Sequence, residues 1–210
     1  MNPKNLIIGS TLMVGFILSV YITLSEANRH ADPVESIPSS SVQVLNRGEE
    51  RITLKDGYSR IGNLQGIVPG SWRRETPSSS MRLAQFSFSD ESGTSELVVF
   101  AGIGGSVDDN LDRWLGQFRR PDNESVADHA TISHEHIGDM DVNFVYTEGT
   151  YLQAGMGMRG PTIEKPNYGL MAAIIKAPDG PYYFKCTGPK KVLDNYRNSF
   201  ETFIHSIEPL

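Results

Sequence analysis

Cysteine is nearly absent from this chain of 210 residues, because Cys186 is its single thiol. An internal disulfide and a metal site built from several cysteines are therefore excluded. No long run of one charge sign occurs either, since 25 acidic residues outnumber 19 basic ones and the net charge is −6. A nucleic-acid-binding protein would need a basic stripe, so we expect no nucleic-acid partner.

One long apolar segment lies at the amino terminus. Residues 6–24 are 19 residues without a charge. A bilayer span needs about 17–25 residues and a signal-peptide apolar region about 7–15, so the length favours a retained transmembrane anchor that makes the membrane a partner. Ser25-Glu26-Ala27 is a small-x-small cleavage site, so a cleaved signal peptide remains the alternative.

The charges before this segment indicate its orientation. Lys4 and the terminal amine favour a cytoplasmic location for residues 1–5, and the chain after residue 25 then lies outside the cytoplasm. We expect a single-pass membrane protein, or a secreted or periplasmic protein if the segment is cleaved. A bacterial lipoprotein anchor is excluded, because no cysteine follows the apolar run.

The rest of the chain divides into a linker and one domain. Residues 25–50 carry prolines, serines and mixed charges without apolar periodicity, which indicates a flexible linker. Residues 51–210 show about six or seven strands, mostly in hairpins, including 81–88 with 96–101 and 131–137 with 140–146. Helices are expected after Ser106 and from Lys190. The fold class is α+β, with a mainly antiparallel sheet and helices packed on it.

The stretch from Phe100 to Phe118 joins a buried strand to an amphipathic helix through a glycine turn. Ser106 stands at the cap position and Asp109 three residues later, a variant of the capping box. The turn suggests phosphate binding, but it lacks the lysine of a Walker loop and the third glycine of a dinucleotide fingerprint. Asp108 and Asp109 would also repel an anion. We interpret the glycines as structural.

The histidines give a sharper candidate site. If Gly138-Asp139 is a two-residue turn, His136 faces Asp141 and His134 faces Asn143 on one side of the hairpin. Imidazole and carboxylate ligands suit a transition metal, so His134, His136 and Asp141 form a candidate metal site. The alternative is a solvated face on which His136 simply pairs with Asp141. No other cofactor is indicated.

Residues 152–168 are rich in glycine, methionine and proline and predict a long loop. Its Met156, Met158 and Arg159 are the candidate partner-binding residues, because methionines suit adaptable contacts. A merely mobile loop is the alternative. Cys186 alternates with Tyr182 and Phe184 on an apolar strand face, so we expect a packed core residue, and no catalytic residues are indicated.

Three segments carry a family resemblance over about residues 60–207. They are Trp72 with Met81-Arg-Leu-Ala-Gln-Phe86, then Gly104-Gly105…Asn110…Arg113-Trp114…Gln117-Phe118, and Tyr183-Phe-Lys-Cys-Thr-Gly-Pro189. The chain resembles exported bacterial proteins of unassigned function, of the hypothetical-lipoprotein type. Its element order resembles the PsbP-like fold of a photosynthetic extrinsic protein, a Ran-binding import factor and DcrB-type lipoproteins. The resemblance implies an adaptor or assembly role and supplies no catalytic residues.

Two functions follow as expectations. The first is a membrane-tethered, extracytoplasmic and non-catalytic binding or adaptor domain with a protein partner whose identity the sequence does not give. The second is a metal-binding or metal-handling exported protein that uses His134, His136 and Asp141.

Overall fold

The computed structural model describes residues 53–155 and 160–210, all within a compact unit that spans Glu50–Leu210. The predicted anchor or signal peptide (6–24), the linker (25–50) and the loop residues Met156, Met158 and Arg159 lie outside the described residues. None of the helices in the described ranges has the length and apolar character needed to cross a bilayer.

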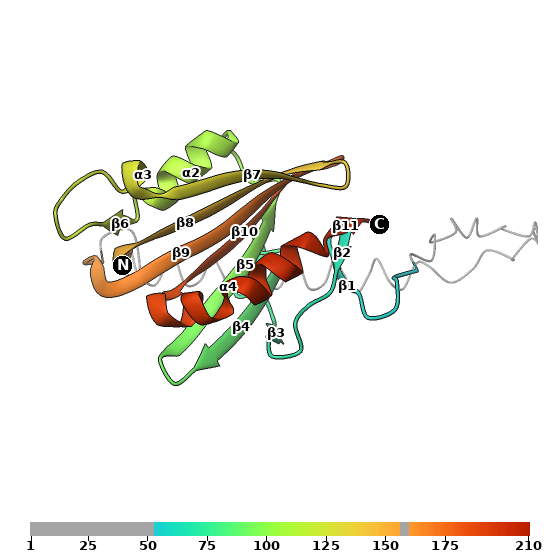
Figure 1. The fold of residues 1–210 in the computed structure, drawn as a ribbon, viewed down its shortest axis with the longest axis horizontal. Coiled ribbons are helices and arrows are strands. Elements are labelled where there is room, and N and C mark those ends of the chain that lie inside the picture. Colours follow the sequence, from blue (N-terminus) through green and yellow to red (C-terminus); the bar gives the residue numbers. More distant parts are fainter. Residues whose placement is uncertain (1–52, 156–159) are drawn as a thin grey trace, which may run out of the picture. The chain divides into compact units, whose positions relative to one another are not determined.

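One antiparallel sheet organises the described residues (Figure 1). Its eight strands follow the order β3-β4-β5-β10-β9-β8-β6, and β7 also pairs with β8. They are β3 (Arg73–Glu75), β4 (Ala84–Asp90), β5 (Gly93–Ala101), β6 (Phe118–Arg119), β7 (Thr131–Ile137), β8 (Met140–Gln153), β9 (Ile163–Ala177) and β10 (Gly180–Pro189). A three-stranded sheet contains β1 (Ser59–Ile61), β2 (Leu64–Gly66) and β11 (Glu208–Pro209).

Both faces of the central strands are buried, each against a different helix. Along β9, Met171, Ala173 and Ile175 belong to the core that includes α4 (Lys190–His205). The intervening Leu170, Ala172 and Ile174 belong to the core that includes α2 (Val107–Leu115). Successive side chains of a strand point to opposite faces, so one continuous apolar run contributes to two cores.

The capping box of α2 is present as the sequence predicts. The Asp109 backbone N–H donates to Ser106 Oγ at 3.0 Å, and the Ser106 backbone N–H donates to Asp109 Oδ2 at 2.9 Å. Each bond satisfies an N–H group that the helix itself leaves without a partner. The apolar stripe then buries Leu111, Trp114 and Leu115 against the sheet.

Several further predictions are confirmed. The fold is α+β with a mainly antiparallel sheet, and β4 and β5 form the expected hairpin. The helix predicted from Lys190 is α4, which buries one apolar face against the sheet. This face comprises Val192, Leu193, Phe200, Phe203 and Ile204, with the partly buried Tyr196 beside it and Ile207 just beyond the helix.

The predicted strand number is wrong, because the described residues contain eleven strands. Those that were missed have two or three residues, too few to show an alternating pattern. One of them, β6, contains Phe118, the end of the stretch in which the sequence predicts an amphipathic helix, because α2 ends at Leu115. A third helix, α3 (Val126–His129), has only four residues.

The predicted loop 152–168 is also shorter than expected. Strand β8 continues to Gln153, and β9 begins at Ile163. Pro166, which indicated a loop, lies where the β8–β9 pairing shifts register between Gly149 and Tyr151. Such an irregularity tolerates a proline because the local ladder hydrogen bonds are already interrupted.

Candidate functional site

The His134 hairpin has the predicted register. His136 lies opposite Asp141 and His134 opposite Asn143. His136 Nδ1 is 2.8 Å from Asp141 Oδ1, and His134 Nδ1 is hydrogen-bonded to the side-chain oxygen of Asn143. Each histidine is thus paired with the residue opposite it, as in the alternative interpretation.

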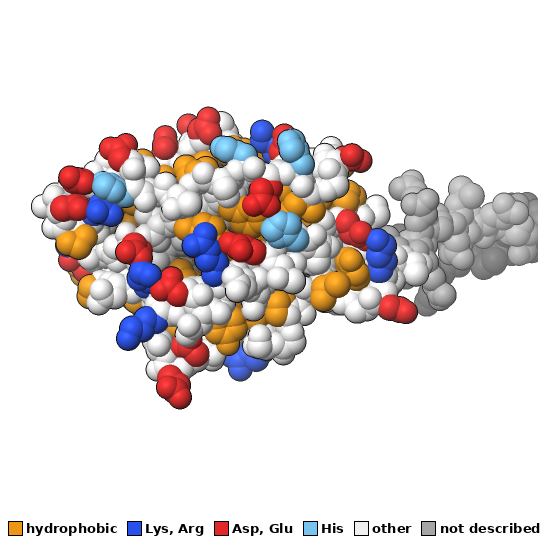
Figure 2. All heavy atoms as spheres, viewed as in Figure 1, with side chains coloured by type: hydrophobic (Ala, Val, Ile, Leu, Met, Phe, Trp, Pro, Cys, Tyr) orange, Lys and Arg blue, Asp and Glu red, His pale blue; other side chains and the backbone are white. Residues whose placement is uncertain are grey.

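No group of three or more His, Cys, Asp or Glu side chains in the described ranges is arranged to hold a metal ion. The metal site at His134, His136 and Asp141 stays a prediction. The surface around the hairpin is of mixed charge: on the face in Figure 2, basic side chains are interspersed with acidic ones and form no stripe.

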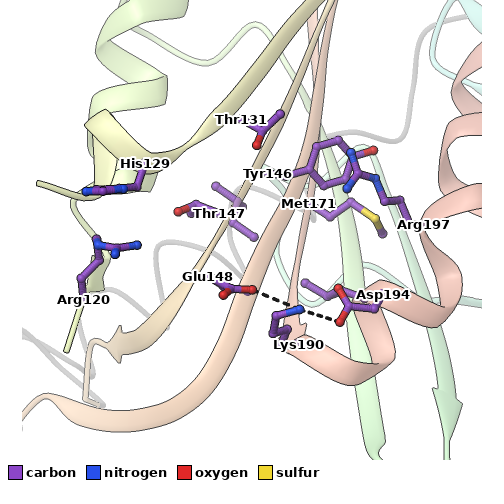
Figure 3. Close-up of a pocket in the computed structure, with 13 residues that line it drawn as sticks. Arg120, His129, Thr131, Tyr146, Thr147, Glu148, Met171, Lys190, Asp194 and Arg197 are labelled. Carbon is purple, nitrogen blue, oxygen red and sulfur yellow. Dashed lines mark hydrogen bonds and ion pairs between the residues drawn. The ribbon is translucent and has the colours of Figure 1, made fainter. Parts of the chain in front are cut away.

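A polar cleft of about 290 Å³, here called the α4 cleft, is lined by residues of β8, β9 and α4 and of the segment 120–131 (Figure 3). Lys190 lies between two carboxylates, with its Nζ 3.1 Å from Glu148 Oε2 and 2.7 Å from Asp194 Oδ2. These hydrogen bonds raise the pKa of Lys190. Because two carboxylates already neutralise the ammonium, a bound anion would add little.

The remaining charges of the α4 cleft are also paired. The Arg197 guanidinium lies 3.7 Å from the Tyr146 ring centroid and 3.1 Å from Glu201 Oε1, while the Tyr146 hydroxyl donates to Glu201 at 2.8 Å. Burial and the Glu201 carboxylate raise the pKa of Tyr146. The other two charged lining residues, Arg120 and His129, pair with Asp122 and Glu124. This cleft therefore joins α4 to the sheet through satisfied pairs.

A larger cleft of about 940 Å³, here called the α2 cleft, lies on the other face of the sheet. The stretch from Phe100 to Gln117 forms most of its wall, with Lys185 of β10 and the exposed residues Ser80 and Met81 completing it. The connection between β5 and α2 therefore both caps the helix and forms a wall of this cleft.

The wall is shaped by a buried amide. Asn110 is fully buried, and its Nδ2 donates to the Gly104 carbonyl at 3.2 Å and to the Ser106 carbonyl at 2.8 Å. These bonds fix the glycine turn to the first turn of α2. A Cβ at Gly104 would meet no atom within 4 Å, and its φ does not require glycine. Packing thus gives no reason for glycine at this point of the wall.

Lys185 is the unusual charge of the α2 cleft. Its Nζ donates to Gln117 Oε1 at 2.5 Å and lies 5.4 Å from the centroid of the Trp114 ring. Burial, and to a smaller extent the Arg113 guanidinium, lower the pKa of Lys185 to about 8. Desolvation of an ammonium without a counter-ion is the physical cause.

Neither cation of this cleft has a carboxylate partner within the described part of the chain. The Lys185 ammonium donates to the side-chain oxygen of Gln117, and the Arg113 guanidinium donates to the side-chain oxygen of Asn110. The one acidic lining residue, Asp109, uses its carboxylate to cap α2. Its charge also interacts with the Arg113 guanidinium. The cleft therefore contains one partly buried ammonium, that of Lys185, without a carboxylate partner in the described part of the chain, unlike the paired charges of the α4 cleft.

Apolar side chains surround this cationic site. Met81 is 71% exposed, Phe100 and Ile103 are partly buried, and Trp114 forms the inner wall. A cleft with apolar walls and few convergent polar groups is the usual form of a ligand site. Lysine beside an arginine within it marks a candidate functional position.

Cys186 lies next to Lys185 in sequence but on the opposite face of β10. It is fully buried in the core under α4, as predicted, and burial raises the pKa of its thiol. Such a thiol is neither accessible nor ionised near neutral pH, so Cys186 is a packed core residue rather than a nucleophile.

No protein-family model matches this chain, and no curated protein matches it either. Among solved structures, the chain is similar to the solution structure of cyanobacterial PsbP (CyanoP) from Synechocystis sp. PCC 6803. The identity is 10%, the match covers 70% of this chain and 87% of that chain, and the TM-score is 0.43. The likeness concerns the fold alone.

Proposed function

We propose that this chain is a non-catalytic binding domain whose binding site is the α2 cleft. We also propose that residues 6–24 hold it at a membrane, that the domain lies outside the cytoplasm, and that its fold is PsbP-like with an adaptor role. The observation that carries the binding function is the unpaired ammonium of Lys185 within an apolar cleft. A partly buried ammonium without a counter-ion is unfavourable, so a ligand that neutralises it gains binding energy.

The lining residues support binding rather than catalysis. A lysine that attacks a carbonyl would need a nearby acid or base to move protons. Among the described residues that line the cleft, Asp109 alone carries a carboxylate, and its oxygen accepts from the Ser106 backbone N–H. Gln117 and Trp114, the immediate neighbours of Lys185, do not titrate in the physiological range.

Photo-cross-linking in intact cells tests this proposal. A photoreactive residue at the exposed Ser80, on the rim of the α2 cleft, should form an adduct that Lys185→Met abolishes. The matched control places the same group at the exposed Lys191 of α4, where Lys185→Met should change nothing. Adducts from Ser80 that persist in Lys185→Met would contradict the proposal. Protease accessibility in intact cells tests the extracytoplasmic location separately.

A further inference from the structure

We propose that the α2 cleft binds an amphiphilic carboxylate, an anionic head group carried on an apolar chain. Its carboxylate lies between Lys185 and Arg113, and its chain lies against Met81, Phe100 and Ile103. This inference rests on the proposed binding function and names the chemical class of the ligand.

The polar end of the cleft selects an anion. Lys185, which is partly buried, and the exposed Arg113 repel each other across the cleft, and an anion between them would remove this repulsion. A cationic ligand would increase it. A neutral ligand would not neutralise the ammonium. Within the described residues, only the Gln117 side chain and the Trp114 ring would then offset the cost of removing its charge from water. Charge-assisted hydrogen bonds from the partly buried ammonium and from the guanidinium are stronger than neutral ones, which favours the anion.

The number of donors favours a carboxylate over a phosphate. A phosphate is normally bound by several convergent N–H groups, often those at the start of a helix. At α2 the capping box already uses two of these groups, the backbone N–H groups of Ser106 and Asp109, and the carboxylates of Asp108 and Asp109 would repel a phosphate there. One ammonium and one guanidinium remain, and a planar carboxylate matches this pair.

The rest of the cleft suits an apolar chain. Met81 leaves 71% of its surface exposed beside the partly buried Phe100 and Ile103, so part of this apolar wall faces water. The volume of about 940 Å³ lies within the range of small-molecule sites. Covering such a wall with hydrocarbon contributes roughly 25 cal/mol for each Å² buried.

A simpler account of Lys185 is a side chain that packs its methylene groups on Trp114 and extends its ammonium toward water. If it is correct, Lys185→Met should change neither octanoate binding nor the yield of the Ser80 photo-adduct. That account also gives no reason for the exposed Met81 beside the partly buried Phe100 and Ile103, or for glycine at the unobstructed position 104. The two accounts therefore differ in a measurable way.

The test titrates the full-length protein with sodium octanoate and follows the fluorescence of Trp114. Trp72→Phe makes Trp114 the sole tryptophan, and it should be tolerated because the buried Trp72 Nε1 has no hydrogen-bond partner in the described structure. Octanoate should perturb the emission saturably. Acetate, which has the head group without the chain, and 1-octanol, which has the chain without the charge, should bind at least tenfold more weakly.

Variants separate the cleft from nonspecific uptake. Lys185→Met should abolish octanoate binding, Lys185→Arg should retain it, and Lys191→Met, on the exposed surface of α4, should have no effect. If Lys185→Met unfolds the protein, Arg113→Gln provides a second test and should weaken binding severalfold. Raising the pH from 7 to 9 should weaken binding about tenfold, because Lys185 loses its proton.

Equal binding of octanoate and 1-octanol, or unchanged octanoate binding by Lys185→Met, would overturn the carboxylate assignment. If octanoate fails but the Ser80 adduct still depends on Lys185, the ligand class is wrong and the binding function stands. If both fail, the α2 cleft is not a binding site.

Discussion

Replacing Lys185 by methionine should stabilise the folded protein while it removes binding. Methionine keeps the length of the side chain that packs on Trp114 but removes the desolvated charge. The pKa of Lys185 falls from an ordinary value of 10.5 to about 8. At 1.36 kcal/mol per pH unit, keeping this ammonium protonated in the folded state costs about 3 kcal/mol at neutral pH.

The gain from Lys185→Met should be smaller than that cost. The substitution also removes the hydrogen bond to Gln117, and the cleft is open enough for water to solvate part of the charge. We expect an increase of about 1–2 kcal/mol in the free energy of unfolding at pH 7. Urea denaturation followed by tryptophan fluorescence measures this difference.

The sign of the pH dependence provides a second check. The folded-state pKa of Lys185 lies below the unfolded one, so between about pH 8 and 10.5 the unfolded chain binds more protons. Lys185 therefore adds stability to the natural protein as the pH rises through this window. The advantage of Lys185→Met should shrink from pH 7 to pH 10, with other titrating groups cancelling in the comparison. A variant less stable at pH 7, or an advantage independent of pH, would refute the reasoning.

Other parts of the fold give independent tests. Ser106→Ala removes the cap of α2 and should lower the free energy of unfolding by about 1 kcal/mol, measured by urea denaturation. Gly188→Ala places a Cβ 1.9 Å from Ser95 Oγ and should cost about 1–3 kcal/mol in thermal unfolding, whereas Gly70→Ala, with no atom within 4 Å, should be nearly neutral. The double substitution His134→Ala and His136→Ala should leave zinc and copper uptake unchanged in calorimetric titration. A loss of uptake would instead favour the metal-handling alternative.

The sequence predicted those parts of the fold whose signals are local. The Gly138-Asp139 turn gave the register of the β7–β8 hairpin, and the spacing of Ser106 and Asp109 gave the capping box. The position of β10 between β5 and β9 could not be predicted, because it depends on pairing between segments more than 80 residues apart. Strands of two or three residues were missed because their formation depends on their neighbours.

The α2 cleft was missed for a similar reason. Lys185 lies 68 residues from Gln117 along the chain, and nothing near it in sequence shows the desolvation of its amine. A signal was nevertheless present: Lys185 lies within the run 182–186, whose other members are all buried and apolar or aromatic. A charged side chain at such a position must either find a partner or line a cavity.

The central claim is that Lys185 makes the α2 cleft a binding site. Its most direct measurement is the yield of the Ser80 photo-adduct in cells that express the natural protein, Lys185→Met or Lys185→Arg. The adduct should disappear in Lys185→Met and persist in Lys185→Arg, since arginine restores the cation. Equal yields in all three proteins would contradict the claim.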